Sequence, residues 1–275
     1  MIKNENIDHG KAFDWGRTSA DYAKFRDIYP EEFYQKILKL GLCTEGQKVL
    51  DIGTGTGVLP RNLYQYGADF TGIDITENQI VQAVALAEKF GMKIDFQCVS
   101  AEKSNFPEHT FDVVTACQCF TYFNHEELAP LLYHMLKDEG KFAVLYMAWL
   151  PYEDEIAGKS EELILKYNPL WTGCGEKRHP IRIPEIYHEF FTMEEEEVFD
   201  LHVPFTRESW HGRMKACRGI GASLPEEEIE KFEVEHQKLL KEIAPENFEV
   251  LHYAAITTMK RKNEKEGAVW ETCGI

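Results

Sequence analysis

The sequence predicts an α/β fold in which helices wind around both faces of a mostly parallel sheet. Apolar runs of strand length alternate with amphipathic, helix-like segments through the first half of the 275-residue chain. Several of these runs end in an acidic or polar residue, as at Asp51 and Asp74. Strands that alternate with helices build a parallel sheet, and ligands bind beyond the carboxyl ends of its strands. We therefore expect a doubly wound domain with a binding site at that edge.

Capping residues and glycines mark where the elements begin and end. Helices are expected to begin at Thr76 and Asn124, because Gln79 and Glu127 complete the spacing of a capping box. The five expected strands cover residues 48–51, 69–73, 94–99, 111–116 and 142–147. Glycines expected to end helices are Gly67, Gly91 and Gly140.

The chain beyond residue 148 is expected to hold a cap over the binding site. Residues 149–192 are rich in aromatic and turn-forming residues, and strand-like alternation resumes only at 198–205 and 248–259. A further amphipathic helix is expected to start at Ser223, with Glu226 three residues later. The resulting division is a helical lid segment at 1–40, a core at 41–148, a cap at 149–196, a completion of the sheet with additional helices at 197–260 and a tail at 261–275.

The most informative motif is the turn after the first strand, which reads VLDIGTGTGVLP over residues 49–60. Gly53, Gly55 and Gly57, together with Thr54, let backbone N–H groups approach a ligand at the start of a helix. Asp51 stands at the mouth of this turn, where its charge would repel phosphates and attract cations. S-adenosylmethionine carries an ammonium, a sulfonium and no phosphate, so it fits this charge pattern better than NAD does. Capping of the strand end is the structural alternative for Asp51.

A second acid supports a nucleoside ligand. Asp74 ends the second strand, 23 residues beyond Asp51, where a carboxylate can hold both ribose hydroxyls. Ile75 and Gln79 can line the same wall, although Gln79 could instead serve only as a helix cap.

Over residues 48–148 the chain resembles class I S-adenosylmethionine-dependent methyltransferases. DIGTGTG at 51–57 looks like the first motif of that superfamily, Asp74 in GIDIT matches its ribose-binding acid, and FDVVTA at 111–116 looks like its fourth strand. The resemblance implies a Rossmann-like sheet of seven strands with an antiparallel last strand. It also implies adenine contacts from Ala101 and Glu102, with an exposed loop position as the alternative for Glu102.

The N-terminal region refines this resemblance. Residues 13–30, with YAKFRDIYP, and the loop 117–124 are similar to the branch containing ubiquinone/menaquinone-biosynthesis and trans-aconitate methyltransferases. In that branch the N-terminal region closes over the cofactor, which implicates Tyr22 and Arg26, while Cys117 and Gln118 would offer backbone groups. Where relatives often have a His-Trp pair after the fourth strand, this chain has Thr121 and Tyr122.

The acceptor half carries no dedicated catalytic motif, because methyl transfer mainly requires a nucleophile held about 3 Å from the methyl carbon. His179, His211 and Tyr122 are candidates for a base. Cations beside aromatic rings could grip a small carboxylate, or could simply pair with the surrounding glutamates. On this basis the candidate substrate-binding residues are Trp149, Arg178, Arg207, Trp210 and His211.

Composition restricts the partners. The net charge of −17, from 30 basic and 47 acidic residues, opposes binding to nucleic acid or to an anionic membrane. The sequence has no apolar run of membrane-spanning length, and its first residues lack the apolar core of a signal peptide, so we expect a cytoplasmic location. The seven cysteines show no disulfide or zinc spacing. We expect no metal; soft-metal or arsenic binding by Cys117 and Cys119 is the less favoured alternative.

The sequence therefore predicts a methyltransferase that converts S-adenosylmethionine to S-adenosylhomocysteine while methylating an O, N, S or C atom of a small molecule. We expect a monomer or homodimer. The alternatives are an NAD(P)-dependent oxidoreductase, against which Asp51 and the GTGTG spacing argue, and a non-catalytic module that binds S-adenosylmethionine, because a fold does not establish activity.

Overall fold

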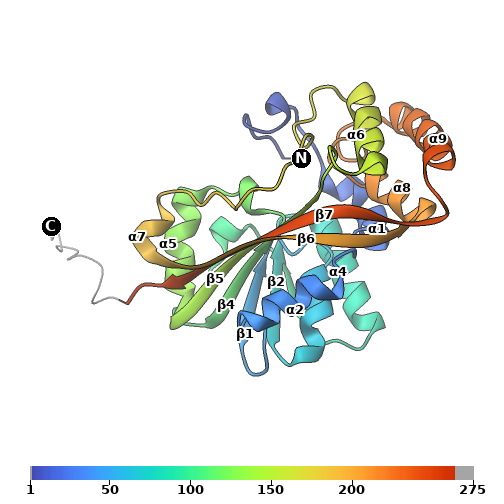
Figure 1. The fold of residues 1–275 in the computed structure, drawn as a ribbon. Helices are drawn as coiled ribbons and strands as arrows, with labels where there is room; N and C mark the ends of the chain where they lie inside the picture. Colours follow the sequence, from blue (N-terminus) through green and yellow to red (C-terminus); the bar gives the residue numbers. More distant parts are fainter. Residues whose placement is uncertain (1, 264–275) are drawn as a thin grey trace.

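A single seven-stranded sheet organises the computed structural model, which describes residues 2–263. In spatial order its strands are β3 Asp95–Cys98, β2 Asp69–Asp74, β1 Lys48–Ile52, β4 Phe111–Cys117, β5 Leu136–Trp149, β7 Asn247–Arg261 and β6 Phe191–Thr206. β7 runs antiparallel to β5 and β6, and the other neighbouring pairs are parallel. Helices cover both faces of the sheet (Figure 1). The expected doubly wound sheet with an antiparallel last strand is confirmed.

Helices surround this sheet and connect its strands. The α-helices are α1 Ser19–Phe25, α2 Glu31–Lys39, α3 Val58–Leu63, α4 Glu77–Lys89, α5 His125–Met135, α6 Glu155–Tyr167, α7 Tyr187–Phe190, α8 Arg207–Lys215 and α9 Glu226–Ile243. The 3₁₀ helices are η1 Asp8–Gly10, η2 Trp15–Thr18, η3 Tyr64–Tyr66, η4 Ala101–Lys103 and η5 Phe120–Tyr122. Among residues 2–263, no helix combines the length and the apolar character needed to cross a membrane.

Two expected helix boundaries were wrong. α9 begins after Pro225, which has an extended backbone at the N-cap position, so Ser223 does not start this helix. Gly140 lies inside β5 and ends no helix, because Leu136 already pairs with Phe111 of β4.

The start of β6 was also misplaced. This strand begins at Phe191, so the last residues of the predicted cap at 149–196 belong to the sheet. The run of glutamates at 194–197 concealed the strand, because β6 is an edge strand and its charges pair with neighbours. Glu194 lies 2.8 Å from Lys141 Nζ, and Glu197 lies 2.7 Å from Lys36 Nζ.

The apolar core is divided by the sheet into two main clusters. In β1, Val49 belongs to the cluster beneath α2 and α8, whereas Leu50 and Ile52 belong to the cluster beneath α5. In β4, Val113 and Val114 divide in the same way. Successive strand residues point to opposite faces, so a strand that is apolar on both faces is buried on both.

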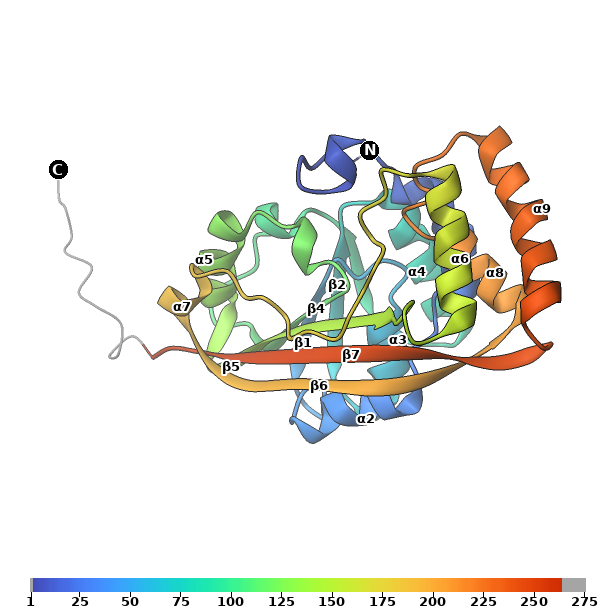
Figure 2. The ribbon, with the colours of Figure 1, turned by 45° about the horizontal axis from the view of Figure 1, so that its top comes forward.

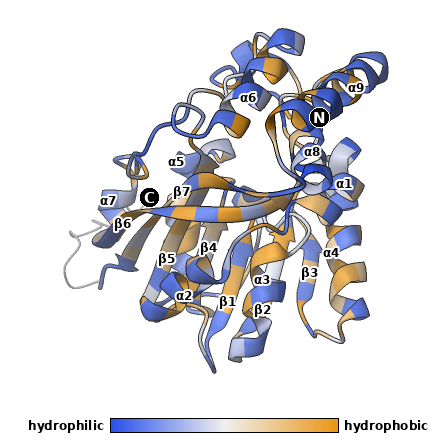
Figure 3. Ribbon diagram, turned by 45° about the vertical axis from the view of Figure 1, so that its right-hand side comes forward, coloured by the Kyte–Doolittle hydropathy of each residue, from blue (hydrophilic) through white to orange (hydrophobic). Residues whose placement is uncertain are grey.

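The cover over the carboxyl ends of the strands comes from three separate parts of the chain. Figure 2 shows α6, α8 and α9 grouped on one side of the molecule, near the N-terminal segment. α8 packs on α1 and α9, and α9 also packs on α6. α9 is mostly hydrophilic (Figure 3) and buries Ile229, Phe232, His236 and Leu240. We propose that α8 and α9, which lie within residues 197–260, belong to the cap together with α6.

The C-terminal boundary also differs from the prediction. The expected tail at 261–275 starts inside β7, because Arg261 is buried and donates from Nε to the carbonyl of Tyr133 at 2.9 Å. The remainder of that predicted tail, residues 264–275, lies outside the described residues.

Candidate active site

A cavity of about 720 Å³ lies beyond the carboxyl ends of β1, β2 and β4. Its walls include Gly53 after β1, Asp74 at the end of β2, and Cys117 at the end of β4. Tyr22 of α1 and Arg213 of α8 cover it. Its volume suits a small ligand, for which binding cavities commonly measure about 300–1,000 Å³. The cavity therefore occupies the position that the sequence predicted for the ligand.

The glycine turn needs its glycines for two physical reasons. Gly53, Gly55 and Gly57 all have positive φ, at 65°, 57° and 72°. A Cβ atom at Gly53 would lie 2.7 Å from Cys119 Sγ, and one at Gly57 would lie 2.6 Å from the Phe96 ring. Gly53 and Gly55 line the cavity, whereas Gly57 and Thr54 do not. Gly57 therefore contributes to packing. Of the motif residues, Gly53 and Gly55 face the cavity.

Gly55 has open space on its cavity side. A Cβ atom there would meet nothing closer than the Tyr22 ring, at 3.7 Å. The absence of a side chain therefore leaves room between the turn and Tyr22.

Asp74 fastens the glycine turn to the end of β2. Its Oδ2 accepts from the Gly55 N–H at 3.0 Å, and its Oδ1 accepts from the Thr76 N–H at 2.8 Å. Burial raises the pKa of this carboxyl, while the two backbone hydrogen bonds oppose that effect. Each carboxylate oxygen keeps a second lone pair, so Asp74 can accept further hydrogen bonds on its cavity side.

Gln79 presents an unsatisfied acceptor at the cavity. The side chain is buried, lines the cavity, and its Oε1 has no hydrogen-bond partner among residues 2–263. Thr76 occupies the N-cap position of α4, but the capping box is not formed. A buried polar atom without a partner is unfavourable, so Gln79 Oε1 is placed to accept a hydrogen bond from a ligand.

Three further residues predicted for the cofactor site, Ile75 on the ribose wall and Ala101 and Glu102 at the adenine, also line the cavity. Ile75 is exposed there, and Ala101 is buried. Both oxygens of Glu102 already accept hydrogen bonds, one from the Ser100 hydroxyl and one from the Asn124 N–H at 3.0 Å. Glu102 therefore holds the start of α5, in addition to any contact with a ligand.

Asp51 lies deeper than expected. The sequence placed this carboxylate at the mouth of the turn, but it is 2% exposed, does not line the cavity, and accepts from Thr115 Oγ1 at 2.7 Å. Strand alternation directs it to the same face as Thr115, its register partner in β4. Burial raises its pKa to about 6, against the hydrogen bond from Thr115, and the charge of Asp74 adds to the rise. Asp51 therefore does not contact the cavity directly.

Two cysteines form part of the wall after β4. The Cys117 thiol donates to Tyr29 Oη at 3.3 Å, and the Cys119 thiol donates to the Ile52 carbonyl at 3.0 Å. Burial raises the pKa of Cys117 to about 12 and that of Cys119 well above its usual range. The thiolate is the metal-binding form, so these neutral thiols give no support to a metal or arsenic site. No group of three potential metal ligands occurs within the described part of the chain.

Gln118, between these cysteines, has the left-handed φ of 67°. Its N–H donates to the Leu145 carbonyl at 2.9 Å, and its side-chain amide donates to the Met147 carbonyl. These two hydrogen bonds hold the backbone that follows β4 in the wall of the cavity.

The far end of the cavity is aromatic and carries ionisable groups. Trp149 lines it and is oriented by Glu161, whose Oε2 accepts from Trp149 Nε1 at 2.8 Å. Glu176 accepts from the hydroxyls of Tyr146 and Tyr253 at 2.7 and 3.0 Å. The remaining members of this end include Trp171, His179, Arg182, Arg213 and Arg218.

Of the three predicted base candidates, two line the cavity. His179 does, with Nε2 3.4 Å from Glu176 Oε2 and Nδ1 2.8 Å from the Pro180 carbonyl. Tyr122 also lines it, but burial raises the pKa of its phenol although Arg218 donates to it at 2.9 Å, so it stays neutral. His211 is wrongly predicted, because it lies between α8 and α9 with Nδ1 2.9 Å from His236 Nδ1.

Three further substrate candidates lie outside the cavity. Arg178 pairs with Asp200 at 2.6 Å, and Arg207 donates to the Ala244 carbonyl at 2.9 Å. Trp210 is fully buried in the core. Ion pairing, a backbone hydrogen bond and core packing therefore account for these three side chains. Of the five predicted substrate residues, only Trp149 lines the cavity.

Three residues that line the cavity were not predicted from the sequence, namely Tyr146, Glu176 and Arg213. Arg213 follows Trp210 and precedes Met214 on the buried side of α8. An arginine among apolar residues on the buried side of a helix was the available signal.

A buried ion pair fastens the N-terminal segment over the cavity. Asp8 is 1% exposed and accepts from Arg218 Nε at 2.8 Å and from the Thr172 N–H at 2.8 Å. Replacing Arg218 with Ala leaves the Asp8 carboxylate buried without its cation, so we expect a loss of about 3 kcal/mol of stability. Differential scanning calorimetry should show a lower Tm, and limited proteolysis should cleave the N-terminal segment first. An unchanged Tm would contradict this role.

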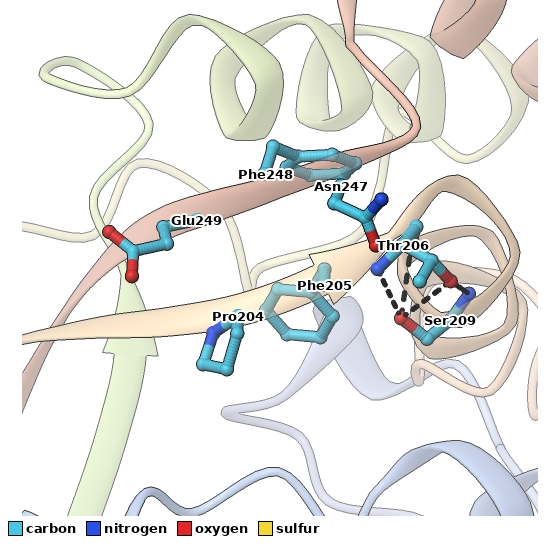
Figure 4. Close-up of a pocket in the computed structure, with 7 residues that line it drawn as sticks. All are labelled: Pro204, Phe205, Thr206, Ser209, Asn247, Phe248 and Glu249. Atoms are coloured by element: carbon cyan, nitrogen blue, oxygen red, sulfur yellow. Dashed lines mark hydrogen bonds between the residues drawn. The ribbon is translucent and has the colours of Figure 1, made fainter.

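A second hollow, of about 420 Å³, lies at the carboxyl end of β6 and shares no residue with the cavity. Figure 4 shows Pro204, Phe205 and Thr206 facing Asn247, Phe248 and Glu249 across the β6–β7 pair. Its hydrogen bonds join Thr206 and Ser209 and form the capping box of α8. These polar groups therefore serve the helix start.

Comparisons with known proteins agree with this geometry. Residues 49–140 match a family model described as a methyltransferase domain. The chain carries a class I methyltransferase domain. As an enzyme of this class it depends on S-adenosylmethionine, as the sequence predicted, and the comparisons do not favour the oxidoreductase alternative.

Individual relatives show how far the likeness extends. An uncharacterized methyltransferase of Schizosaccharomyces pombe is 25% identical over 230 residues, which cover 82% of this chain and 86% of that protein. A ubiquinone biosynthesis O-methyltransferase of Bradyrhizobium diazoefficiens is 34% identical over 152 residues, or 54% of this chain and 58% of the relative. The crystal structure of a putative methyltransferase from Bacillus halodurans C-125 aligns with a TM-score of 0.52 at 16% identity, covering 83% of this chain and 98% of that one, and supports the fold.

The residues of the cavity fit the methyl donor of this class. The open side of Gly55 admits a ligand close to the backbone. Gln79 Oε1 is an acceptor without a partner, and Asp74 retains accepting capacity for hydroxyl groups. A nucleoside with an amino acid tail carries hydroxyl and amino groups that can donate hydrogen bonds to Gln79 Oε1 and to the Asp74 carboxylate.

Proposed function

We propose that this enzyme transfers the methyl group of S-adenosylmethionine to a small molecule, with S-adenosylhomocysteine as the product. One observation carries the proposal: a single cavity joins the nucleoside-type residues Asp74 and Gln79 to an aromatic end at Trp149. The cavity volume of about 720 Å³ suits a cofactor and a small acceptor and not a polymer. Relatives named as ubiquinone biosynthesis O-methyltransferases support a small acceptor methylated on oxygen.

The cofactor end is proposed to hold the donor by complementary charge and hydrogen bonding. Asp74 would bind the ribose hydroxyls, Gln79 the nucleoside, and the backbone of Gly53 and Gly55 the methionine part. Arg26 lies 4.5 Å over the Tyr22 ring and forms no ion pair with a carboxylate among residues 2–263, so it is suited to the methionine carboxylate. When bound, S-adenosylmethionine supplies an electrophilic methyl group on a sulfonium.

His179 is the proposed base for an acceptor hydroxyl. With its Nδ1 proton directed at the Pro180 carbonyl, its Nε2 lone pair can take the proton of the hydroxyl as the oxygen attacks the methyl carbon. Glu176 lies 3.4 Å from Nε2 and would stabilise the imidazolium that forms. The hydroxyl oxygen gains the methyl group as the methyl–sulfur bond of the donor breaks, and its proton passes to His179. The positive charge lost by the sulfonium, which becomes the neutral thioether of S-adenosylhomocysteine, therefore appears on the imidazolium.

The partner predictions stay as proposals. The net charge of −17 opposes attraction to nucleic acid and to anionic membranes. We propose a cytoplasmic monomer or homodimer that acts on a metabolite.

Asp51 should make cofactor binding depend on pH. Its pKa of about 6 in the free protein would fall when the cationic donor binds near it, because the charge favours the carboxylate. Affinity for S-adenosylmethionine is therefore highest above pH 6. It declines as pH falls through 6, by up to about tenfold per pH unit. Calorimetry between pH 7 and pH 5 should show this slope in the wild type and lose it in Asp51→Asn. An equal slope in both proteins would contradict the role of Asp51.

Turnover with an unidentified acceptor tests the proposal as a whole. Incubation with S-adenosylmethionine labelled in the methyl group and a small-molecule cell extract should yield a labelled small product. Affinity for S-adenosylhomocysteine without labelled product from any extract would favour the non-catalytic module. Affinity for NAD in place of S-adenosylhomocysteine would favour the oxidoreductase.

A further inference from the structure

The acceptor end of the cavity contains a buried cation with no anion beside it. Arg213 lines the cavity and is 6% exposed, and its Nε and Nη1 have no hydrogen-bond partner among residues 2–263. The guanidinium lies 5.0 Å over the Trp149 ring. Burial of a charged group without a counter-ion is strongly unfavourable, because one aromatic contact does not replace the lost hydration. An anionic group of a ligand in the cavity would supply the partner that the guanidinium of Arg213 lacks.

The surroundings of Arg213 increase the cost of its charge. Burial lowers the pKa of its guanidinium to about 9, and the neighbouring positive charge of Arg26 lowers it further in the same direction. Neither arginine has a carboxylate partner within residues 2–263. The pattern contrasts with Arg218 in the same cavity, which is paired with Asp8 at 2.8 Å. In a chain with 47 acidic residues, the lack of an acid beside two adjacent arginines favours a binding role.

The two arginines rest on different aromatic rings of the cavity wall. Arg26 rests on Tyr22, whose ring faces Gly55 of the cofactor turn, so Arg26 is the nearer cation to the methionine end. Arg213 rests on Trp149, at the end of β5 and in the aromatic part of the cavity. With Arg26 assigned to the methionine carboxylate, Arg213 is the cation that remains for a second anion.

We propose that Arg213 binds a carboxylate of the methyl acceptor, which makes small carboxylic acids with an apolar or aromatic body the substrate class. This inference rests on the proposed function. The guanidinium fork can bind both oxygens of a carboxylate, and Trp149 and Trp171 offer apolar surface for the rest of the molecule. The carboxylate is the binding group, and the methylated hydroxyl is a separate group near His179.

Fractionated extracts test this proposal with the complete enzyme. A small-molecule cell extract is separated on an anion exchanger, and each fraction is assayed with methyl-labelled S-adenosylmethionine. Acceptor activity should be confined to the retained, anionic fractions. Arg213→Gln should lower kcat/KM for that acceptor at least 100-fold and change the Kd for S-adenosylhomocysteine by less than threefold. Arg207→Gln, which removes the same charge from α8 outside the cavity, should change neither value.

Thermal stability separates a binding role from a structural one. Removing an unpaired buried charge relieves a cost, so Arg213→Gln should unfold at the wild-type Tm or above it. A marked fall in Tm would indicate that Arg213 serves the fold and would overturn the proposal. Acceptor activity in the neutral or cationic fractions would overturn it as well. If no fraction gave a labelled product, the proposed methyl transfer would be wrong, and this inference with it. The Kd for S-adenosylhomocysteine, measured by calorimetry, would then show separately whether the cofactor site is correct.

Discussion

Replacing Asp74 with Ala should weaken binding of S-adenosylhomocysteine by roughly 100-fold to 10,000-fold. The carboxylate is expected to accept hydrogen bonds from both ribose hydroxyls, and hydrogen bonds to a charged group contribute about 1.5–3 kcal/mol each. Asp74 also accepts from the Gly55 N–H at 3.0 Å, so its loss releases the glycine turn as well. Isothermal titration calorimetry of wild type and variant measures the change in Kd.

Two controls make the Asp74 result specific. Arg207→Gln alters a charge outside the cavity and should leave the Kd within a factor of two. Asp74→Asn keeps one carbonyl acceptor and should fall between wild type and Asp74→Ala. Unchanged affinity in Asp74→Ala would mean that the nucleoside lies elsewhere.

Replacing His179 with Ala should lower kcat by about 100-fold to 10,000-fold, the usual contribution of a positioned general base. His179 is the remaining base candidate from the sequence that both lines the cavity and can accept a proton there. Its loss should leave the Kd for S-adenosylhomocysteine unchanged, since the cofactor end lies at the glycine turn. Single-turnover kinetics with the labelled donor measures the chemical step directly.

The neighbouring Arg178 provides the matched control for His179. Arg178 pairs with Glu153 and Asp200 outside the cavity, so Arg178→Gln should retain the wild-type kcat. Glu176→Gln should lower kcat more mildly than His179→Ala, because Glu176 acts by stabilising the imidazolium. A kcat for His179→Ala within threefold of wild type would show that the reaction needs no base at this position.

The cofactor half could be predicted because its signals are local in sequence. Gly53 and Gly55 follow a strand directly, and Asp74 ends the next strand, so parallel pairing brings them to one edge. The structure then reveals what local pattern cannot, namely how deep each side chain lies. Asp51 is turned toward Thr115 by strand alternation, and Gly57 packs on Phe96.

The acceptor half could not be predicted because long-range packing assembles it. Arg213 reaches the cavity from a helix between β6 and β7, while Trp149 comes from β5. The sequence favoured Arg207 and His211 as cations on one helical face beside Trp210, but neither lines the cavity. The predicted start of β6 was also wrong, because the glutamates at 194–197 do not look like a strand in the sequence. In the structure two of them pair with Lys36 and Lys141 along the edge strand.

A crystal structure of the enzyme with S-adenosylhomocysteine tests the central claim most directly. We predict its ribose on Asp74, its adenine beside Ala101, and its sulfur directed toward the aromatic end that holds Trp149 and Arg213. Electron density for the ligand outside this cavity, or with its sulfur directed away from Trp149, would contradict the account.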